Sequence, residues 1–255
     1  MLLIENLSVA YPARQGAAAV LKALSLSIPE GEVLAVLGPS GCGKTTLIHT
    51  LAGVVHSQSG RVVLERDGRQ TPLNPKTHAI AVIPQNCGLL PWKTVRQNCL
   101  LPARLRGQDI GKAQAAFEQI CEALKIGHLK DSYPNHISGG QLRRAAMARA
   151  FLQNPDVLLM DEPFTALDEI TRYEAWDLFL STWRQQRAVT ILVTHSLEEA
   201  LYLGREIAVM GQTGGAILSR HENPFFSQLQ PDAPEYAALK KRLLHSLAPA
   251  QEAAL

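Results

Sequence analysis

The sequence lacks several features that would place the protein in other classes. No apolar run approaches the roughly 20 residues that a membrane-spanning helix needs. Residues 1–6 lack the basic and apolar regions of a secretory signal peptide, so we expect none there. The four cysteines form no CxxC pair, which fits free thiols in a reducing compartment better than a zinc site or disulfides.

Two further absences concern modules and charge. Repeats, low-complexity segments and long linkers are missing, so no flexible second module is expected. The net charge of +2 is too small to indicate nucleic-acid binding. Charge is uneven, however, because ten Lys or Arg residues stand against four Asp or Glu residues between Lys93 and Ala150. A solvated helical face, a docking surface or a nearby phosphate would each explain this excess.

What the chain does contain is a glycine-rich turn between a buried-strand pattern at residues 33–37 and a helix pattern at residues 47–52. The turn consists of Gly38, Pro39, Ser40, Gly41, Cys42, Gly43, Lys44, Thr45 and Thr46. Its spacing is that of the P-loop, and an ordinary Gly-rich turn would not need Lys-Thr at this position. Its glycines let consecutive backbone N–H groups surround phosphate oxygens. Lys44 should reach the β- and γ-phosphates of a nucleoside triphosphate, and Thr45 should bind Mg²⁺.

The remaining patterns predict an α/β core interrupted by a helical insertion. Strands are expected at residues 2–10, 20–28, 61–64, 79–83, 156–161, 188–194, 205–210 and 215–218. A loop at residues 11–16 should separate the first two, which alternate as antiparallel strands do, and the last two should form a hairpin. Helices are expected at residues 111–124, 141–152, 170–186 and 234–247. The strand–helix–strand order from residue 156 to 194 predicts a parallel sheet.

Two acidic residues end the strand at residues 156–161. Asp161 and Glu162 follow an apolar run, which is the Walker B pattern, although a solvated acidic pair would read the same in isolation. Strand ends in open α/β sheets border the ligand crevice, so both carboxylates can face a nucleotide. Asp161 would hold Mg²⁺, and Glu162 would polarise the attacking water.

A second glycine-rich segment opens the predicted helix at residues 141–152. It consists of Ser138, Gly139, Gly140 and Gln141. Ser138 is a plausible N-cap, and the Gly pair permits an anion to approach exposed N–H groups. Taken alone the segment could be a simple helix start, but it stands about twenty residues before Walker B.

These motifs, with Pro163, residues 166–168 and the pair Thr194-His195, resemble the nucleotide-binding subunit of ATP-binding cassette (ABC) transporters. The resemblance runs from about residue 2 to residue 220 with every motif in order. It implies an α/β, P-loop (RecA-like) nucleotide-binding domain with an antiparallel β subdomain and a helical subdomain. The implied boundaries are residues 1–91 and 155–230 for the core with its β subdomain, 92–154 for the helical subdomain, and 231–255 for a short tail.

The resemblance also implies roles that the residues alone leave open, since Tyr11, Gln85 and His195 would otherwise fit ordinary solvated or structural positions. Tyr11 matches the aromatic that stacks on adenine, and Gln85 matches the Q-loop glutamine that touches Mg²⁺ and the attacking water. His195 matches the switch histidine at the γ-phosphate, and Asp168 matches the D-loop acid that couples two sites. Two subunits would sandwich two ATP molecules, each P-loop facing the partner's Ser138–Gln141 signature. All catalytic positions are filled, so we expect an active ATPase.

The segment from Gln85 to Asn98 adds a more specific resemblance. Residues 89–98 are similar to those of the nitrate, sulfonate and taurine importer branch, in which this region receives the permease. The resemblance therefore implies a homodimeric ATPase, peripheral on the cytoplasmic face of the inner membrane. Its partners would be permease subunits and, indirectly, a solute-binding protein. The solute itself would not touch this subunit, and no added regulatory domain is expected after residue 220.

Three other functions remain as alternatives. A soluble ABC ATPase of DNA repair or translation would usually carry a coiled-coil insertion or a second cassette, and the chain has no sustained heptads. A P-loop kinase would not need the signature or the D-loop. An exporter would usually fuse membrane spans to the cassette.

Overall fold

The structure is a computed structural model that describes residues 1–13, 16–165 and 167–252. The chain divides into two compact units. Unit 1 consists of Met1–His78 and Val189–Leu255, and unit 2 consists of Ala79–Ala188. The subdomain boundaries expected from the sequence remain predictions.

Unit 1 contains an antiparallel sheet with the strand order β2-β1-β4-β5. Its strands are β1 (Leu2–Ala13), β2 (Gly16–Ile28), β4 (Ser59–Arg66) and β5 (Arg69–Pro72). Apolar side chains of β1 and β2, such as Leu2, Ile4 and Leu26, are buried, whereas every residue of β5 is exposed. The half-buried alternation expected for the first two strands is therefore confirmed.

Two details of this sheet differ from the sequence-based expectation. The prediction of a loop at residues 11–16 is wrong at both ends. Tyr11 pairs with Ala18, and Ala13 pairs with Gly16, so these residues belong to β1 and β2. Arg14 and Gln15 lie outside the described residues. Strand β5 was not expected, although Asp67 and Gly68, both with positive φ, form the Asp-Gly turn that signals a two-residue hairpin.

Four further strands of unit 1 lie side by side in the order β10-β9-β3-β8. They are β3 (Val33–Leu37), β8 (Val189–Thr194), β9 (Glu206–Met210) and β10 (Ile217–Glu222). Strand β3 is parallel to both β8 and β9, and β10 turns back antiparallel to β9, which confirms the hairpin. All residues of β3 and β8 are buried, as parallel strands covered on both faces require.

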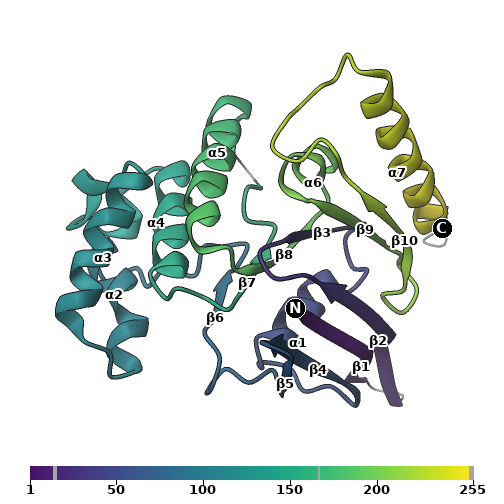
Figure 1. Cartoon of the computed structure of the whole chain (residues 1–255), viewed down its shortest axis with the longest axis horizontal. Helices are drawn as coiled ribbons and strands as arrows, with labels where there is room; N and C mark the ends of the chain where they lie inside the picture. Colours follow the sequence, from purple (N-terminus) through teal and green to yellow (C-terminus); the bar gives the residue numbers. More distant parts are fainter. Residues whose placement is uncertain (14–15, 166, 253–255) are drawn as a thin grey trace. The chain divides into compact units, whose positions relative to one another are not determined.

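The described residues of unit 1 form three helices, namely α1 (Lys44–Leu51), α6 (Leu197–Leu203) and α7 (Pro234–Glu252). Helix α7 is longer than the expected segment and packs over β9 (Figure 1). Its Tyr236, Leu239 and Leu243 join a buried cluster with Phe225 and Ile207. None of the helices in the described ranges combines the length and apolar content of a membrane span.

In its described residues, unit 2 combines two parallel strands with four α-helices, which can be followed in Figure 1. The strands are β6 (Ile80–Ile83) and β7 (Val157–Asp161), and the helices are α2 (Val95–Leu105), α3 (Ile110–Ala123), α4 (Gly139–Phe151) and α5 (Glu169–Gln186). Phe179 of α5 contacts the rings of Phe151 and Phe164 at centroid distances of 5.9 and 6.2 Å. The predicted helical character of residues 92–154 is thus found within this unit.

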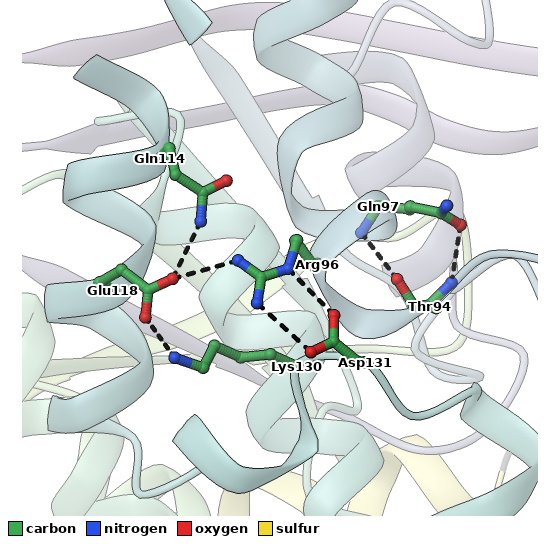
Figure 2. A network of polar contacts seen from close by, with 7 residues as sticks. All are labelled: Thr94, Arg96, Gln97, Gln114, Glu118, Lys130 and Asp131. Carbon is green, nitrogen blue, oxygen red and sulfur yellow. Dashed lines mark hydrogen bonds and ion pairs between the residues drawn. The ribbon is translucent and has the colours of Figure 1, made fainter. Parts of the chain in front are cut away.

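A polar network connects helices α2 and α3 with the segment before η2 (Pro134–His136), as Figure 2 shows. Arg96 donates to Asp131 at 3.1 Å and to Glu118 at 3.1 Å. Glu118 also accepts from Gln114 at 2.9 Å and from Lys130. Hydrogen bonds and ion pairs at the surface of unit 2 thus connect α2, α3 and residues 130–131.

The network predicts a pH dependence of stability. The Lys130 ammonium lowers the pKa of Glu118, and the Arg96 guanidinium lowers the pKa of Asp131. A carboxyl whose pKa is lower in the folded state stabilises the fold above its unfolded pKa of about 4 and loses that contribution as the pH falls. The difference in melting temperature between wild type and Arg96→Gln should therefore be larger at pH 7 than at pH 3. Asp131 is exposed and Glu118 is half-buried, so both carboxyls are screened by dissolved ions and the difference should also shrink in high salt.

The control for this measurement is Lys112→Gln, which removes a positive charge from α3 at a position outside the network of Figure 2. Its melting-temperature difference from wild type should vary less with pH. Equal pH dependence of the two variants would contradict the assignment of this stability to the network.

Candidate nucleotide-binding site

The sequence-predicted site residues fall into two groups, one in each unit. Unit 1 holds Tyr11, the P-loop residues 38–46 and His195. Unit 2 holds the remaining positions, namely Gln85, Ser138, Gly139, Gly140, Gln141, Asp161, Glu162 and Asp168. Ala166, part of the motif that contains Asp168, lies outside the described residues.

The P-loop connects β3 to α1 in unit 1. Gly38 donates its N–H to the carbonyl of Thr194 at 3.2 Å, so the loop leaves the sheet beside the end of β8. Gly41 and Gly43 have φ values of 81° and 108°, a region that side chains disfavour. Helix α1 begins directly after Gly43, whose carbonyl accepts from Leu47 at 2.9 Å. A glycine turn thus leads into a helix N-terminus, which is the arrangement that binds phosphate.

Lys44 lies along this loop with only 5% of its surface exposed. Its ammonium donates to the carbonyls of Gly38 and Pro39 at 2.8 and 2.9 Å. The side chain therefore returns over the loop that would enclose the phosphates. Thr45, whose side chain carries a hydroxyl, is exposed at the start of the helix, whereas Cys42 and Thr46 are buried.

Tyr11 lies close to the P-loop although it is 35 residues away in sequence. Its hydroxyl is 3.5 Å from Oγ1 of Thr46, and 38% of the residue is exposed. Strand β1 carries it there because the strand extends to Ala13 instead of ending before Tyr11. This position is consistent with stacking on a base, and that role remains a prediction.

The glycines of the loop allow a direct test of its backbone strain. A Cβ added at Gly43 would lie 2.9 Å from Cδ2 of Leu21, whereas a Cβ at Gly41 would meet nothing within 4 Å. We expect Gly43→Ala to lower the free energy of unfolding by about 2–4 kcal/mol, since strain and a steric clash add. Gly41→Ala carries the strain alone and should lose about 1–2 kcal/mol. Urea unfolding measures both, and equal losses would contradict the clash.

His195 follows β8 directly and is exposed. Its neighbours are fixed by polar contacts. Thr194 donates its hydroxyl to the buried Glu199 and accepts from the N–H of Ser196 at 3.0 Å. Ser196 caps α6 by accepting from Glu199 N at 3.3 Å. His195 is therefore held at the same strand end to which Gly38 is bonded, and its contact with a γ-phosphate remains a prediction.

In unit 2, Gln85 and Glu162 approach each other at the ends of two parallel strands. Ile83 of β6 pairs with Met160 of β7, so the next residues of both strands leave the sheet at the same edge. Nε2 of Gln85 lies 3.5 Å from Oε2 of Glu162. The structure thus brings together two side chains whose expected roles, both at the attacking water, remain predictions.

Glu162 has φ 45°, an uncommon conformation for a residue with a side chain. Such strain persists where surrounding contacts determine the backbone, and it is typical of functional sites. Asp161, one residue earlier, is buried at the end of β7. Thr165 also places its Oγ1 3.5 Å from Oε2 of Glu162. Sequence reasoning did not identify this contact, because a threonine three residues after an acid carries no distinctive signal.

The signature segment forms the N-terminus of α4. The hydroxyl of Ser138 accepts from Gln141 N at 3.3 Å, and the Gln141 side chain accepts from Ser138 N at 2.9 Å. This capping box confirms the predicted N-cap. Ser138 and Gly139 are exposed, as an anion clamp for a second molecule would require.

Asp168 caps another helix of unit 2. Its carboxylate accepts a hydrogen bond from the N–H of Thr171 at 3.0 Å. Hydrogen bonds from the backbone and the side chain of Thr171 lower the pKa of Asp168. Ile170, in the first turn of α5, is 83% exposed. The structure thus gives Asp168 a capping role, while its coupling role remains a prediction.

The segment before α2 presents an exposed aromatic side chain. Trp92 is 69% exposed, whereas Asn98 is almost completely buried. The Asn98 side chain accepts from Leu90 N at 2.7 Å and donates to the carbonyls of Leu90, Lys93 and Thr94 at 2.9 to 3.1 Å. One buried amide therefore shapes the turn that carries Trp92.

The basic excess between Lys93 and Ala150 is not simply a solvated face. Arg143 is buried, and it donates to backbone carbonyls within unit 2. Arg149 donates to the carbonyl of Cys87 at 2.9 Å, and Arg144 pairs with Glu174 at 2.6 Å. The solvated-face interpretation is therefore wrong for Arg143, because its guanidinium bonds to backbone carbonyls of two loops instead of to water.

Comparisons with known proteins agree with this fold and its motifs. Residues 21–165 match the family described as ABC transporter. The taurine import ATP-binding protein TauB of Rhizobium johnstonii is 33% identical over 258 residues, covering 96% of this chain and 97% of that protein. The aliphatic sulfonates import ATP-binding protein SsuB 1 of Paracoccus denitrificans is 40% identical over 228 residues, covering 89% and 87%.

Solved structures show the same architecture. The dimeric post-hydrolysis structure of the ATP-binding cassette MJ0796 bound to ADP and Pi has a TM-score of 0.76 at 25% identity, covering 87% of this chain and 98% of that one. The P-loop, the capped signature helix and the two strand-end carboxylates define a nucleotide-binding cassette. The chain belongs to the ABC transporter family, which confirms the predicted family and fold class.

Proposed function

We propose that the chain is the ATP-hydrolysing subunit of a bacterial ABC importer for nitrate, an organic sulfonate, taurine or a similar small solute. The observation that carries the hydrolytic part is the approach of Gln85 to Glu162, 3.5 Å apart at the shared edge of β6 and β7. The relatives named as taurine and aliphatic sulfonate import proteins support the transport part.

The residues of unit 1 fit the phosphates of ATP. The N–H groups of the loop and the first turn of α1 supply donors, and Lys44 supplies a positive charge. Tyr11 lies beside Thr46 and would stack on adenine.

Mg²⁺ prefers oxygen ligands, and Thr45 of unit 1 and Gln85 and Asp161 of unit 2 each offer one, so we assign the ion to these residues from their motifs. Bound with ATP, the ion would neutralise charge on the β- and γ-phosphates. Glu162 would accept a proton from the attacking water, which Gln85 would orient, and His195 would contact the γ-phosphate.

The exposed signature supports pairing of two subunits. Ser138 and Gly139 lie at the N-terminus of α4, where a phosphate of a nucleotide held by a second copy would find N–H donors. Asp168 would couple the two sites. ATP favours the closed pair because it binds that state better, and hydrolysis would reopen it.

The exposed Trp92 supports a docking surface for permease subunits on the segment from Gln85 to Asn98. An exposed aromatic on a rigid turn is typical of an interface anchor. The subunit would then lie on the cytoplasmic face of the cell membrane, and a solute-binding protein would act on the other side.

The test is affinity capture from membranes of the source cells with Glu162→Gln, ATP and Mg²⁺, followed by identification of the retained proteins. We expect a permease with several membrane spans, and we expect Trp92→Ala to lose the permease while keeping its ATPase activity. Recovery of only a soluble dimer, or of nucleic acid or ribosomes, would leave the ATPase chemistry standing and remove the transport assignment. It would favour the alternative of a soluble ABC ATPase.

A further inference from the structure

Arg143 makes a set of contacts that no role described above explains. It lies on α4, five residues after the N-cap Ser138, and only 9% of its surface is exposed. Its guanidinium donates to the backbone carbonyls of Pro163 and Thr165, and more weakly to that of Gln85 at 3.4 Å. One side chain therefore bonds to the loop after β6 and to the loop after β7.

These two loops carry the hydrolytic pair. One bonded carbonyl belongs to Gln85 itself, and another belongs to Pro163, the residue after Glu162. Thr165, whose carbonyl is the third partner, also contacts Glu162 through its hydroxyl. The strained φ of Glu162 needs neighbouring contacts that hold the following backbone in place, and Arg143 supplies two of them.

We propose that Arg143 is a positioning residue for ATP hydrolysis, which holds the Gln85 loop and the Glu162 loop at a fixed separation. The inference rests on the proposed ATPase function and adds a residue to it. A planar guanidinium with five donors can bond to both loops at once, whereas a lysine presents a single point charge. Arg149 differs from Arg143 because the carbonyls to which it donates, those of Cys87 and Gly88, belong to one loop only.

The test compares steady-state ATPase kinetics of wild type, Arg143→Gln and Arg143→Lys. A small displacement of reacting groups costs up to about 100-fold in rate, so we expect kcat of Arg143→Gln to fall about 10- to 100-fold. KM for ATP should stay within about 2-fold. The carbonyls that Arg143 bonds to belong to the loops after β6 and β7, so the substitution should remove no ground-state interaction with ATP. Arg143→Lys should retain an intermediate kcat.

The matched control is Arg144→Gln on the same helix. Arg144 donates to Glu174 on α5 and not to either loop, so its kcat should stay near that of wild type. Melting temperatures of all variants separate a general loss of folding from the kinetic effect. Equal kcat values for Arg143→Gln and Arg144→Gln at matched folded fractions would overturn the proposal.

A second readout distinguishes positioning from a merely structural role. In the Glu162→Gln background the pair is already inactive, so adding Arg143→Gln should not lower the residual rate further. Hydrogen exchange at residues 84–88 and 162–165 should accelerate in Arg143→Gln but not in Arg144→Gln. An additive loss of rate, or unchanged exchange in both loops, would contradict the proposal. Absence of ATPase activity in the wild type would instead contradict the proposed function.

Discussion

ATP hydrolysis by Glu162→Gln should fall about 100- to 10,000-fold in kcat, since general-base catalysis contributes factors of this size. Glutamine has the shape of glutamate but cannot take a proton from water at neutral pH. The glutamine side chain can also reach Gln85 and Thr165 as glutamate does. The fold and the nucleotide affinity should therefore stay near those of wild type. Single-turnover phosphate release measures the rate, and fluorescence of a labelled nucleotide measures the affinity.

The control is Glu118→Gln, another carboxylate of unit 2, which belongs to the polar network of Figure 2 and to no strand end. Its kcat should remain within about 2-fold of wild type, even if its melting temperature falls. A Glu162→Gln variant with wild-type kcat would show that another group accepts the proton.

Lys44→Ala should weaken ATP binding about 10- to 150-fold, because a hydrogen bond to a charged group contributes roughly 1.5–3 kcal/mol. Isothermal titration of the purified protein with ATP measures this loss. The control is Lys76→Ala, an exposed lysine of unit 1, whose affinity should match that of wild type.

A stability measurement must accompany the titration. Lys44 also bonds to the carbonyls of Gly38 and Pro39, so its removal changes the loop as well as the charge. Lys44→Arg keeps the charge and should fall between wild type and Lys44→Ala. Wild-type affinity in a folded Lys44→Ala protein would contradict the role assigned to the P-loop.

Contiguous motifs explain why much of the site was predictable. The P-loop and the Walker B strand each combine a buried run with a specific turn, so residue spacing alone predicts which atoms would face a phosphate. Ser138 could likewise be recognised as an N-cap, since a capping box is a local pattern. The proximity of Gln85 to Glu162 needed the parallel pairing of β6 and β7, which the sequence indicates only through its strand order.

Other features depend on tertiary contacts that sequence patterns do not report. The extension of β1 through Tyr11 follows from pairing with β2, and local residues such as Pro12 favour a loop there. The burial of Arg143 depends on carbonyls that lie 58, 20 and 22 residues away. An arginine in a helix has no local signal that separates such a position from a solvated one.

The most direct test of the account is the molar mass of Glu162→Gln in solution with ATP and Mg²⁺, measured by light scattering after gel filtration. The account predicts twice the chain mass of 27.8 kDa with ATP, and the mass of one chain when Ser138→Arg is added. Ser138→Arg should still bind ATP, because the proposed function assigns Ser138 to the site of the second copy. A monomer that binds ATP without pairing, or pairing that survives Ser138→Arg, would contradict the composite site on which the proposed function depends.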